Sequence, residues 1–226
     1  MIWGVLQFPG SCDERDALHA CTVASGEPAR LIWHEERDLG GIDAVVVPGG
    51  FSYGDYLRAG AIARFSPAMG AVAELAAAGG PVLGICNGFQ VLCEAGLLPG
   101  ALLLNESMRF ICRQVDLVVD GPKTSTYETP EAHRPAVLSI PAKHGEGRYY
   151  APEDRLDALE ANGQVAYRYA PGQNPNGSAR DIAGVRNEAG NVLGLMPHPE
   201  HAVDPLTGST DGLRVFEAVA AARATA

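Results

Sequence analysis

The first half of the chain alternates short apolar runs with stretches in which apolar residues recur every three or four positions. The apolar runs predict buried strands at 2–8, 30–34, 44–47 and 82–85. The helical spacing predicts helices over 13–24, 66–78 and 88–95. Because strands and helices alternate, we expect an α/β fold with a single open, mostly parallel sheet flanked by helices.

The second half of the chain has a different pattern, in which few helices separate the strands. Strands are predicted at 115–119, 136–140, 164–169, 182–187 and 192–196. We interpret them as antiparallel additions to the same sheet, followed by an amphipathic helix over 211–222. The polar, proline-bounded segment 122–135 is expected to be an exposed excursion. No linker or repeat interrupts the pattern, so residues 1–226 are expected to form a single domain.

Composition narrows the class of protein. The 226 residues are 46% hydrophobic, enough for a sizeable core, and carry a net charge of -10. An acidic surface repels phosphate backbones and anionic lipid, so nucleic acid and membranes are poor partners. The N-terminal run has no basic start like that of a signal peptide. The 5 cysteines, an odd number without paired close spacing, indicate a reducing compartment, so we expect a cytoplasmic protein.

One cysteine lies in a pattern suited to a nucleophile. Gly84-Ile85-Cys86-Asn87-Gly88 joins a predicted strand to a predicted helix in the form Gly-x-nucleophile-x-Gly. A sharp turn there projects the side chain out of the sheet, and the positive end of the following helix favours the thiolate. The alternative is a buried core cysteine beside a tight turn. The four cysteines without such a setting are interpreted as small apolar residues: Cys12, Cys21, Cys93 and Cys112.

A cysteine nucleophile needs a histidine, which a third group usually orients. His198 follows the strand predicted at 192–196, within Pro197-His198-Pro199-Glu200. Prolines favour extended backbone, in which residues two positions apart face the same way, so His198 and Glu200 can act as base and orienting carboxylate. The alternatives are a surface loop or a metal site that includes His201. The prolines exclude the helix that a His-Glu-x-x-His zinc motif needs, so no metal is expected.

Two backbone N–H groups are candidates for an oxyanion hole. The N–H of Asn87 lies at the start of the helix that follows the nucleophile. Pro48-Gly49-Gly50 ends the strand at 44–47. Ligands collect beyond the carboxyl ends of parallel strands, so we expect Gly50 and Cys86 at the same edge of the sheet. A plain tight turn is the alternative interpretation of the two adjacent glycines.

These motifs, in the order Pro-Gly-Gly, Gly-x-Cys-x-Gly and His-Pro-Glu, resemble the class I, triad-type glutamine amidotransferases, whose sheet is flavodoxin-like. Longer stretches at 49–60, 143–147, 174–178 and 196–201 are similar to the glutaminase subunits of phosphoribosylformylglycinamidine synthases. The similarity covers almost the whole chain. The long stretch rich in tyrosine and glycine narrows the resemblance from the superfamily to these subunits.

The resemblance implies site residues of three kinds, which are the catalytic triad Cys86, His198 and Glu200, the oxyanion-hole pair Gly50 and Asn87, and the substrate contacts Gln90, His144 and Gly145. Many relatives in the wider superfamily have asparagine where this chain has Lys143, so a side-chain contact from that position is in question. A solvated loop is the alternative interpretation of 144–147.

The resemblance also implies a reaction and its partners. Glutamine is hydrolysed to glutamate and ammonia, and the ammonia passes to a larger ATP-dependent subunit that makes formylglycinamidine ribonucleotide in de novo purine biosynthesis. A small accessory subunit completes the complex. The sequence contains no Gly-x-x-x-x-Gly-Lys-Ser/Thr loop, so ATP and Mg²⁺ are assigned to the partner and no cofactor to this chain.

Two other functions remain open at this point. A cysteine peptidase or deglycase-like hydrolase can use a similar elbow, although such proteins commonly carry histidine directly after the nucleophile, where this chain has Asn87. A non-catalytic scaffold subunit would tolerate the loss of Cys86, and the presence of all three triad residues argues against it. Hydrolysis of glutamine or of a peptide would separate the first alternative from an amidotransferase.

Overall fold

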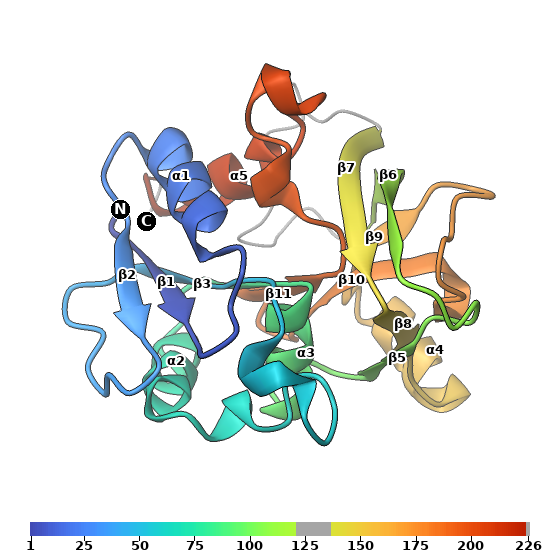
Figure 1. The fold of residues 1–226 in the computed structure, drawn as a ribbon, viewed down its shortest axis with the longest axis horizontal. Helices are drawn as coiled ribbons and strands as arrows, with labels where there is room; N and C mark the ends of the chain where they lie inside the picture. The colour runs from blue at the N-terminus through green and yellow to red at the C-terminus, as the bar shows by residue number, and fades with distance from the viewer. Residues whose placement is uncertain (121–136, 225–226) are drawn as a thin grey trace.

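One sheet runs through both halves of the chain (Figure 1). A computed structural model describes residues 1–120 and 137–224. Within these residues nine strands pair in the order β2-β1-β3-β4-β11-β10-β9-β6-β7. Their bounds are β1 Trp3–Gln7, β2 Arg30–Trp33, β3 Ala44–Val47, β4 Val82–Ile85, β6 Ile111–Val119, β7 Val137–His144, β9 Val165–Tyr169, β10 Ile182–Arg186 and β11 Val192–Leu195. The predicted fold class is confirmed.

The five strands from β2 to β11 in this order are parallel neighbours. Every residue of β3, β4 and β11 is buried, because helices cover both faces. Figure 1 shows α1 (Glu14–Ser25) and α5 (Leu213–Ala224) on one face, and α2 (Pro67–Ala77) and α3 (Asn87–Glu94) on the other. Trp3 of β1 meets Phe216 of α5 edge to face, with ring centroids 6.1 Å apart, which fixes the last helix on the sheet.

Strands β10, β9, β6 and β7 pair antiparallel with their neighbours, as predicted for the second half. The strand predicted at 192–196 is an exception. It corresponds to β11, which pairs parallel with β4 and is fully buried like the other central strands, so its prediction as an antiparallel addition is wrong. The sequence analysis missed β5 (Ala101–Leu104) and β8 (Glu146–Tyr150), which form a separate two-stranded sheet, and helix α4 (Glu153–Ala161). Strand β5 is an apolar run of only four residues, and it is partly buried because it lies outside the main sheet. Helix α4 buries only Leu156 and Leu159, so its apolar contrast is weak. Strand β7 runs on to His144, four residues past its predicted end. Segment 122–135 lies outside the described residues.

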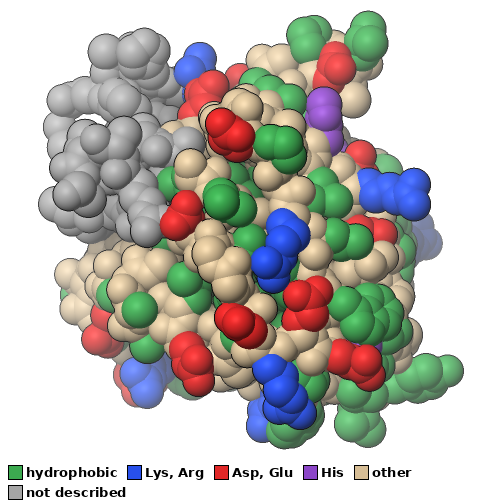
Figure 2. Space-filling view, turned by 90° about the vertical axis from the view of Figure 1, so that its left-hand side faces the viewer, with side chains coloured by type: hydrophobic (Ala, Val, Ile, Leu, Met, Phe, Trp, Pro, Cys, Tyr) green, Lys and Arg blue, Asp and Glu red, His purple; other side chains and the backbone are tan. Residues whose placement is uncertain are grey.

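The surface over β2 and α1 shows acidic and basic side chains interspersed with apolar ones (Figure 2). No patch of a single charge sign gathers on the described part of this face. None of the described helices is both long enough and apolar enough to span a membrane.

Candidate active site

The parallel strands deliver their carboxyl ends to one edge of the sheet, where a cavity of about 210 Å³ opens. Asp13 follows β1, Gly50 follows β3, Cys86 follows β4 and His198 follows β11. All four residues line the cavity, so Gly50 and Cys86 share an edge as predicted. The antiparallel strand β7 reaches the same place from the other half of the sheet, because the His198 N–H donates to the Pro141 carbonyl at 2.8 Å.

Cys86 occupies a strained turn between β4 and α3. Its φ of 51° and ψ of -106° are uncommon for a residue with a side chain. A Cβ at Gly84 would lie 2.9 Å from the backbone of Gly88, and a Cβ at Gly88 would overlap the Val47 carbonyl oxygen. The two glycines therefore let α3 approach β4 and β3 closely, which is the physical reason for the Gly-x-Cys-x-Gly pattern.

The Cys86 sulfur lines the cavity and is not sealed in the core. Its backbone N–H donates to the Leu195 carbonyl at 2.8 Å, which ties the elbow to β11. The thiol donates to the Lys143 carbonyl at 3.8 Å, from β7. The side chain stands at the N-terminus of α3, whose free N–H groups favour a thiolate.

His198 and Glu200 form a buried pair. Their side chains are 1% and 0% exposed, and His198 Nδ1 lies 2.6 Å from Glu200 Oε1. His198 Nε2 is buried without a partner of hydrogen-bond geometry among the described residues, and His198 lines the same cavity as Cys86. Burial alone would lower the pKa of His198, but the Glu200 carboxylate and then the Cys86 sulfur raise it to about 10.

The backbone that brings His198 and Glu200 together is not the predicted extended segment. Residues Pro199–His201 form a 3₁₀ turn. Proline fixes φ at about -65°, a value found both in helical turns and in extended segments. Pro199 therefore also suits the first position of a tight turn. The prediction of the pair holds, but its geometric reason is different.

Asn87 follows Cys86 directly in the chain, and Gly50 lines the same cavity as Cys86. Asn87 is the first residue of α3, so its N–H has no carbonyl partner within the helix. The Gly49 carbonyl accepts from the N–H groups of Cys12 and Asp13 at 3.2 and 3.3 Å, and the Gly50 N–H of the same peptide points the opposite way. Gly50 has a φ of 140°, and a Cβ there would lie 2.6 Å from the Cys12 nitrogen, so glycine is required.

The Asn87 side chain has a role that the sequence analysis did not foresee. Its Oδ1 accepts from the Ser52 N–H at 3.1 Å. Its Nδ2 donates to Asp55 Oδ1 at 3.1 Å and to Gln90 Oε1 at 3.0 Å. The amide thus holds the segment after Gly50 against the elbow with both of its ends.

The three predicted substrate contacts, Gln90, His144 and Gly145, all line the cavity. Gln90 donates through Nε2 to the Glu146 carbonyl at 2.5 Å. His144 is buried, and its Nδ1 lies 3.0 Å from Asn105 Oδ1. Burial lowers the pKa of His144 to about 3, so the ring is neutral. A Cβ at Gly147 would overlap this ring.

The stretch 144–147 is therefore not a solvated loop. It is the tight connection between β7 and β8. Asn105 Nδ2 donates to the His144 carbonyl at 2.8 Å, and the Gly147 N–H donates to Asn105 Oδ1 at 3.1 Å. Asn105 was missed because it lies on a short segment after β5, far from this connection in sequence.

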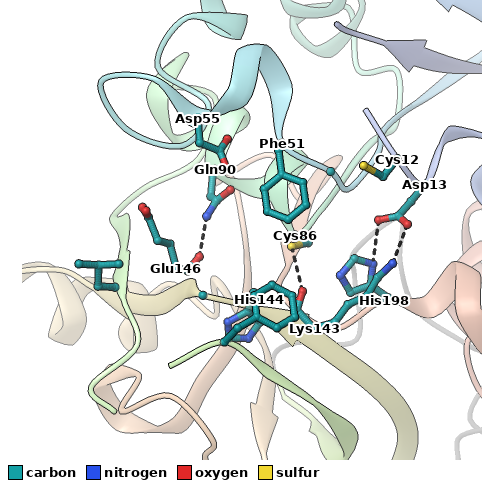
Figure 3. A pocket seen from close by; sticks show the side chains of 14 residues that line it. Cys12, Asp13, Phe51, Asp55, Cys86, Gln90, Lys143, His144, Glu146 and His198 are labelled. Atoms are coloured by element: carbon teal, nitrogen blue, oxygen red, sulfur yellow. Dashed lines mark hydrogen bonds and ion pairs between the residues drawn. The ribbon is translucent and has the colours of Figure 1, made fainter. Parts of the chain in front are cut away.

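Asp13 and Lys143, two charged residues beside the triad, were not predicted as site residues. Asp13 Oδ2 lies 3.5 Å from His198 Nδ1, and Asp13 Oδ1 lies 2.6 Å from Lys143 Nζ (Figure 3). His201 Nε2 lies 3.3 Å from the same Oδ1. The only signal for Asp13 in the sequence was its place after the first strand, which alone does not point to His198.

The cysteines separate into two groups. Cys21 is buried in the core and Cys93 is partly buried, as expected of small apolar residues. Cys12 and Cys112 are exposed, so that interpretation is wrong for both. Cys12 also lines the cavity, and burial together with the Asp13 charge raises its pKa, which keeps it a thiol near neutral pH.

Four groups could in principle hold a cation, since ligand atoms of Asp13, His198, Glu200 and His201 lie within 4.8 Å of one another. The Lys143 ammonium already contacts Asp13, and Glu200 Oε1 already faces the His198 ring nitrogen. These contacts make the cluster a poor site for an additional positive charge.

Comparison with known proteins decides the family. Residues 3–214 match the model of the CobB/CobQ-like glutamine amidotransferase domain. The chain belongs to this family. It is 59% identical over 217 residues to phosphoribosylformylglycinamidine synthase subunit PurQ of Rhodococcus jostii RHA1, covering 96% of this chain and 95% of that one. It is 57% identical to the subunit of the same name from Synechococcus elongatus, covering 94% and 95%.

Solved structures agree with this membership. A chain of the PurLQS structure from Thermotoga maritima superposes with a TM-score of 0.84 at 41% identity, covering 96% of both chains. The glutaminase domain of Trypanosoma brucei CTPS with bound acivicin superposes at 0.60 and 18% identity, covering 97% and 93%, which shows a shared fold. The resemblance expected from the sequence is confirmed.

Proposed function

We propose that this chain is the glutaminase subunit of a phosphoribosylformylglycinamidine synthase and that it hydrolyses glutamine through Cys86, His198 and Glu200. One observation supports the proposal most strongly. The elbow thiol of Cys86 and the imidazole of His198 line the same cavity, and His198 Nδ1 lies 2.6 Å from the buried Glu200 carboxylate. The named relatives carry this synthase's name at 57 to 59% identity. We take the whole chain, residues 1–226, as one amidotransferase domain.

The first half of the reaction releases ammonia. The Cys86 thiolate attacks the carboxamide carbon, and the carbonyl oxygen becomes an oxyanion that the N–H groups of Gly50 and Asn87 stabilise. The protonated His198 gives its Nε2 proton to the amide nitrogen as the C–N bond breaks. Ammonia leaves, and a γ-glutamyl thioester remains on Cys86.

The second half restores the enzyme. Neutral His198 takes a proton from water at Nε2, and the hydroxide attacks the thioester carbon. The C–S bond breaks, and the Cys86 sulfur stays as a thiolate beside the reprotonated imidazole. The new γ-carboxyl group loses its proton to solvent, and glutamate leaves. Glu200 stays ionised throughout, because its role is to hold the Nδ1–H tautomer and to stabilise the imidazolium.

The cavity end beyond Cys86 suits the amino-acid end of glutamine. In Figure 3, Asp55, Gln90 and Glu146 lie on the opposite side of Cys86 from His198 and Asp13. Burial and the Glu146 charge raise the pKa of Asp55 to about 6, so a substrate ammonium group would relieve this repulsion. We expect Asp55→Asn to raise KM for glutamine far more than KM for glutaramate, which lacks the α-amino group. Equal increases for both compounds would contradict this subsite.

The segment 51–58 is assigned to contact with the larger synthase subunit. Tyr56 and Leu57 are 73% and 90% exposed beside the cavity, and Tyr53, Asp55 and Leu57 all have left-handed φ values. Exposed large apolar groups on a strained loop are typical of an interaction surface. We assign the binding of ATP and Mg²⁺ to the partner subunits. We place the complex in the cytoplasm. The chain itself uses no metal, so EDTA is expected to leave glutamine hydrolysis unchanged.

The proposal is tested by covalent trapping. A diazoketone analogue of glutamine should alkylate Cys86, and mass spectrometry of the digested protein should find the adduct on the peptide that contains it. The Cys12→Ser variant is the matched control, since Cys12 is the second thiol of the cavity. Labelling of Cys12 in place of Cys86, or hydrolysis of peptides without hydrolysis of glutamine, would overturn the assignment.

A further inference from the structure

Asp13 is a buried carboxylate that the three-residue mechanism does not use. Its side chain is 5% exposed, with Oδ2 at 3.5 Å from His198 Nδ1 and Oδ1 at 2.6 Å from Lys143 Nζ. Burial alone would raise its pKa, but the hydrogen bond from His201 and the charges of His198 and Lys143 hold that pKa well below its usual range. Asp13 is therefore ionised in the resting site.

A second carboxylate beside the catalytic histidine has two opposed effects. Together with Glu200, it stabilises the imidazolium form of His198. It also adds negative charge to the cavity that holds the Cys86 sulfur, and a like charge disfavours the thiolate. The catalytic couple needs both the imidazolium and the thiolate, so an unbalanced Asp13 would help one and oppose the other.

Lys143 provides the balance. Its side chain starts on β7 and runs past His198 to Asp13, as Figure 3 shows. Burial alone would lower the pKa of Lys143, but the hydrogen bond with Asp13 and the nearby charges of Asp13, Glu200 and Cys86 raise it. A neutral side chain at position 143 could bond to Asp13 but could not offset its charge.

We propose that Lys143 and Asp13 act as an electrostatic pair that sets the ionisation of the Cys86–His198 couple, with Lys143 favouring the thiolate and Asp13 favouring the imidazolium. Neither residue touches the reacting atoms through its side chain in this scheme, so both are positioning residues. The inference rests on the proposed function, because it concerns the same nucleophile and base.

The neighbouring charges limit what else could produce such an effect. Three segments of the described chain place titratable groups around Asp13: Lys143 of β7, then His198, Glu200 and His201 after β11, and Cys12 on the N-terminal side. Asp16 lies next to His201, at 3.8 Å. Cys86 lines the same cavity as Lys143 and His198, so Lys143 is near both the carboxylate and the nucleophile.

The test is the pH dependence of iodoacetamide alkylation, in which the thiolate sulfur displaces iodide. The full chain carries Cys12→Ser as the common background, and mass spectrometry follows the Cys86 peptide alone. Lys143→Met should raise the pH midpoint of alkylation by on the order of one unit. Asp13→Asn should lower it by a similar amount, because Glu200 still favours the imidazolium of His198 while the negative charge that disfavours the thiolate is gone. The double variant should return close to the background value. Asp16→Asn, which removes an exposed carboxylate of the same helix, should shift the midpoint little.

Opposite shifts that cancel in the double variant are a signature of charge, because a packing defect in either variant would not be repaired by the other. Thermal unfolding checks that each variant is folded, and Lys143→Gln replaces Lys143→Met if the latter is not. Unchanged midpoints, or shifts in the same direction, would overturn the inference while leaving a reactive Cys86 and the proposed function intact. A Cys86 that shows no pH-dependent reactivity even in the background protein would overturn both.

Discussion

Substitutions in the His198–Glu200 pair should distinguish the role of the base, His198, from that of the residue that orients it, Glu200. His198→Ala removes the group that moves every proton in the reaction, and it leaves the Glu200 carboxylate buried without its partner. General acid–base catalysis typically contributes about 10²- to 10⁴-fold. We therefore expect the kcat for glutamine hydrolysis to fall by at least that factor in His198→Ala.

Glu200→Gln changes less. A glutamine oxygen can still accept from His198 Nδ1 at the 2.6 Å separation, and Asp13 remains 3.5 Å from the same nitrogen. What is lost is the charge assistance of one hydrogen bond, about 1–2 kcal/mol, which corresponds to roughly 5- to 30-fold in kcat. The new amide NH₂ would take the place of Glu200 Oε2, which has no partner among the described residues. We therefore also expect a loss of about 1–3 kcal/mol in the free energy of unfolding.

The substitution Glu200→Gln should also shift the pH dependence of kcat/KM in a definite direction. Glu200 raises the pKa of His198, and the imidazolium–thiolate couple exists only below that pKa. Removing the carboxylate charge lowers the pKa, so the alkaline limb of kcat/KM should move to lower pH in Glu200→Gln.

The assay is steady-state release of glutamate by the reconstituted complex across a pH series, with exposed Glu188→Gln as the matched control. Equal losses of kcat for Glu200→Gln and His198→Ala, or an alkaline limb that does not move, would refute the reasoning.

Two further predictions concern the elbow and the partner. Gly88→Ala should lower the free energy of unfolding by about 1–3 kcal/mol, since its Cβ would overlap the Val47 carbonyl oxygen, whereas Gly70→Ala on α2 meets open space and should be neutral or stabilising in thermal unfolding. The isolated chain should hydrolyse glutamine poorly and be activated by the synthase subunit, because contact with segment 51–58 can adjust the adjoining Gly50 donor, and one oxyanion donor is worth about 100- to 1000-fold. Full activity of the chain alone, unchanged on titration with the synthase and its substrates, would contradict the second prediction.

The features that the sequence predicted well are those encoded locally. The elbow is a five-residue pattern whose glycines are dictated by close backbone contacts, so the position of Cys86 could be predicted directly. The alternation of strands and helices in the first half predicted the parallel pairing of its strands. His198 and Glu200 are two positions apart and needed only a short turn to meet. The buried strands of the parallel core have short, nearly continuous apolar runs, which made them recognisable in the sequence.

The features that it did not predict depend on pairs distant along the chain. Asp13 and Lys143 are 130 positions apart, and nothing near either residue signals the other. Asn105 holds His144 from 39 positions away, so the sequence left a solvated loop open as an alternative for 144–147. Strands β5 and β8 pair with each other outside the main sheet. The buried positions of β8 are Gly147 and Tyr149, which do not give the sequence a clear alternation of apolar and polar residues.

In the proposed function, Cys86 generates the ammonia that the synthase uses. This role is tested by comparing glutamine and ammonium chloride as nitrogen sources for a synthase complex reconstituted with Cys86→Ala, with Cys12→Ser as the control for a second cavity thiol. We expect Cys86→Ala to abolish glutamine-dependent synthesis and to leave ammonia-dependent synthesis unchanged, while Cys12→Ser retains both. Glutamine-dependent synthesis at the wild-type rate by the Cys86→Ala complex would contradict it.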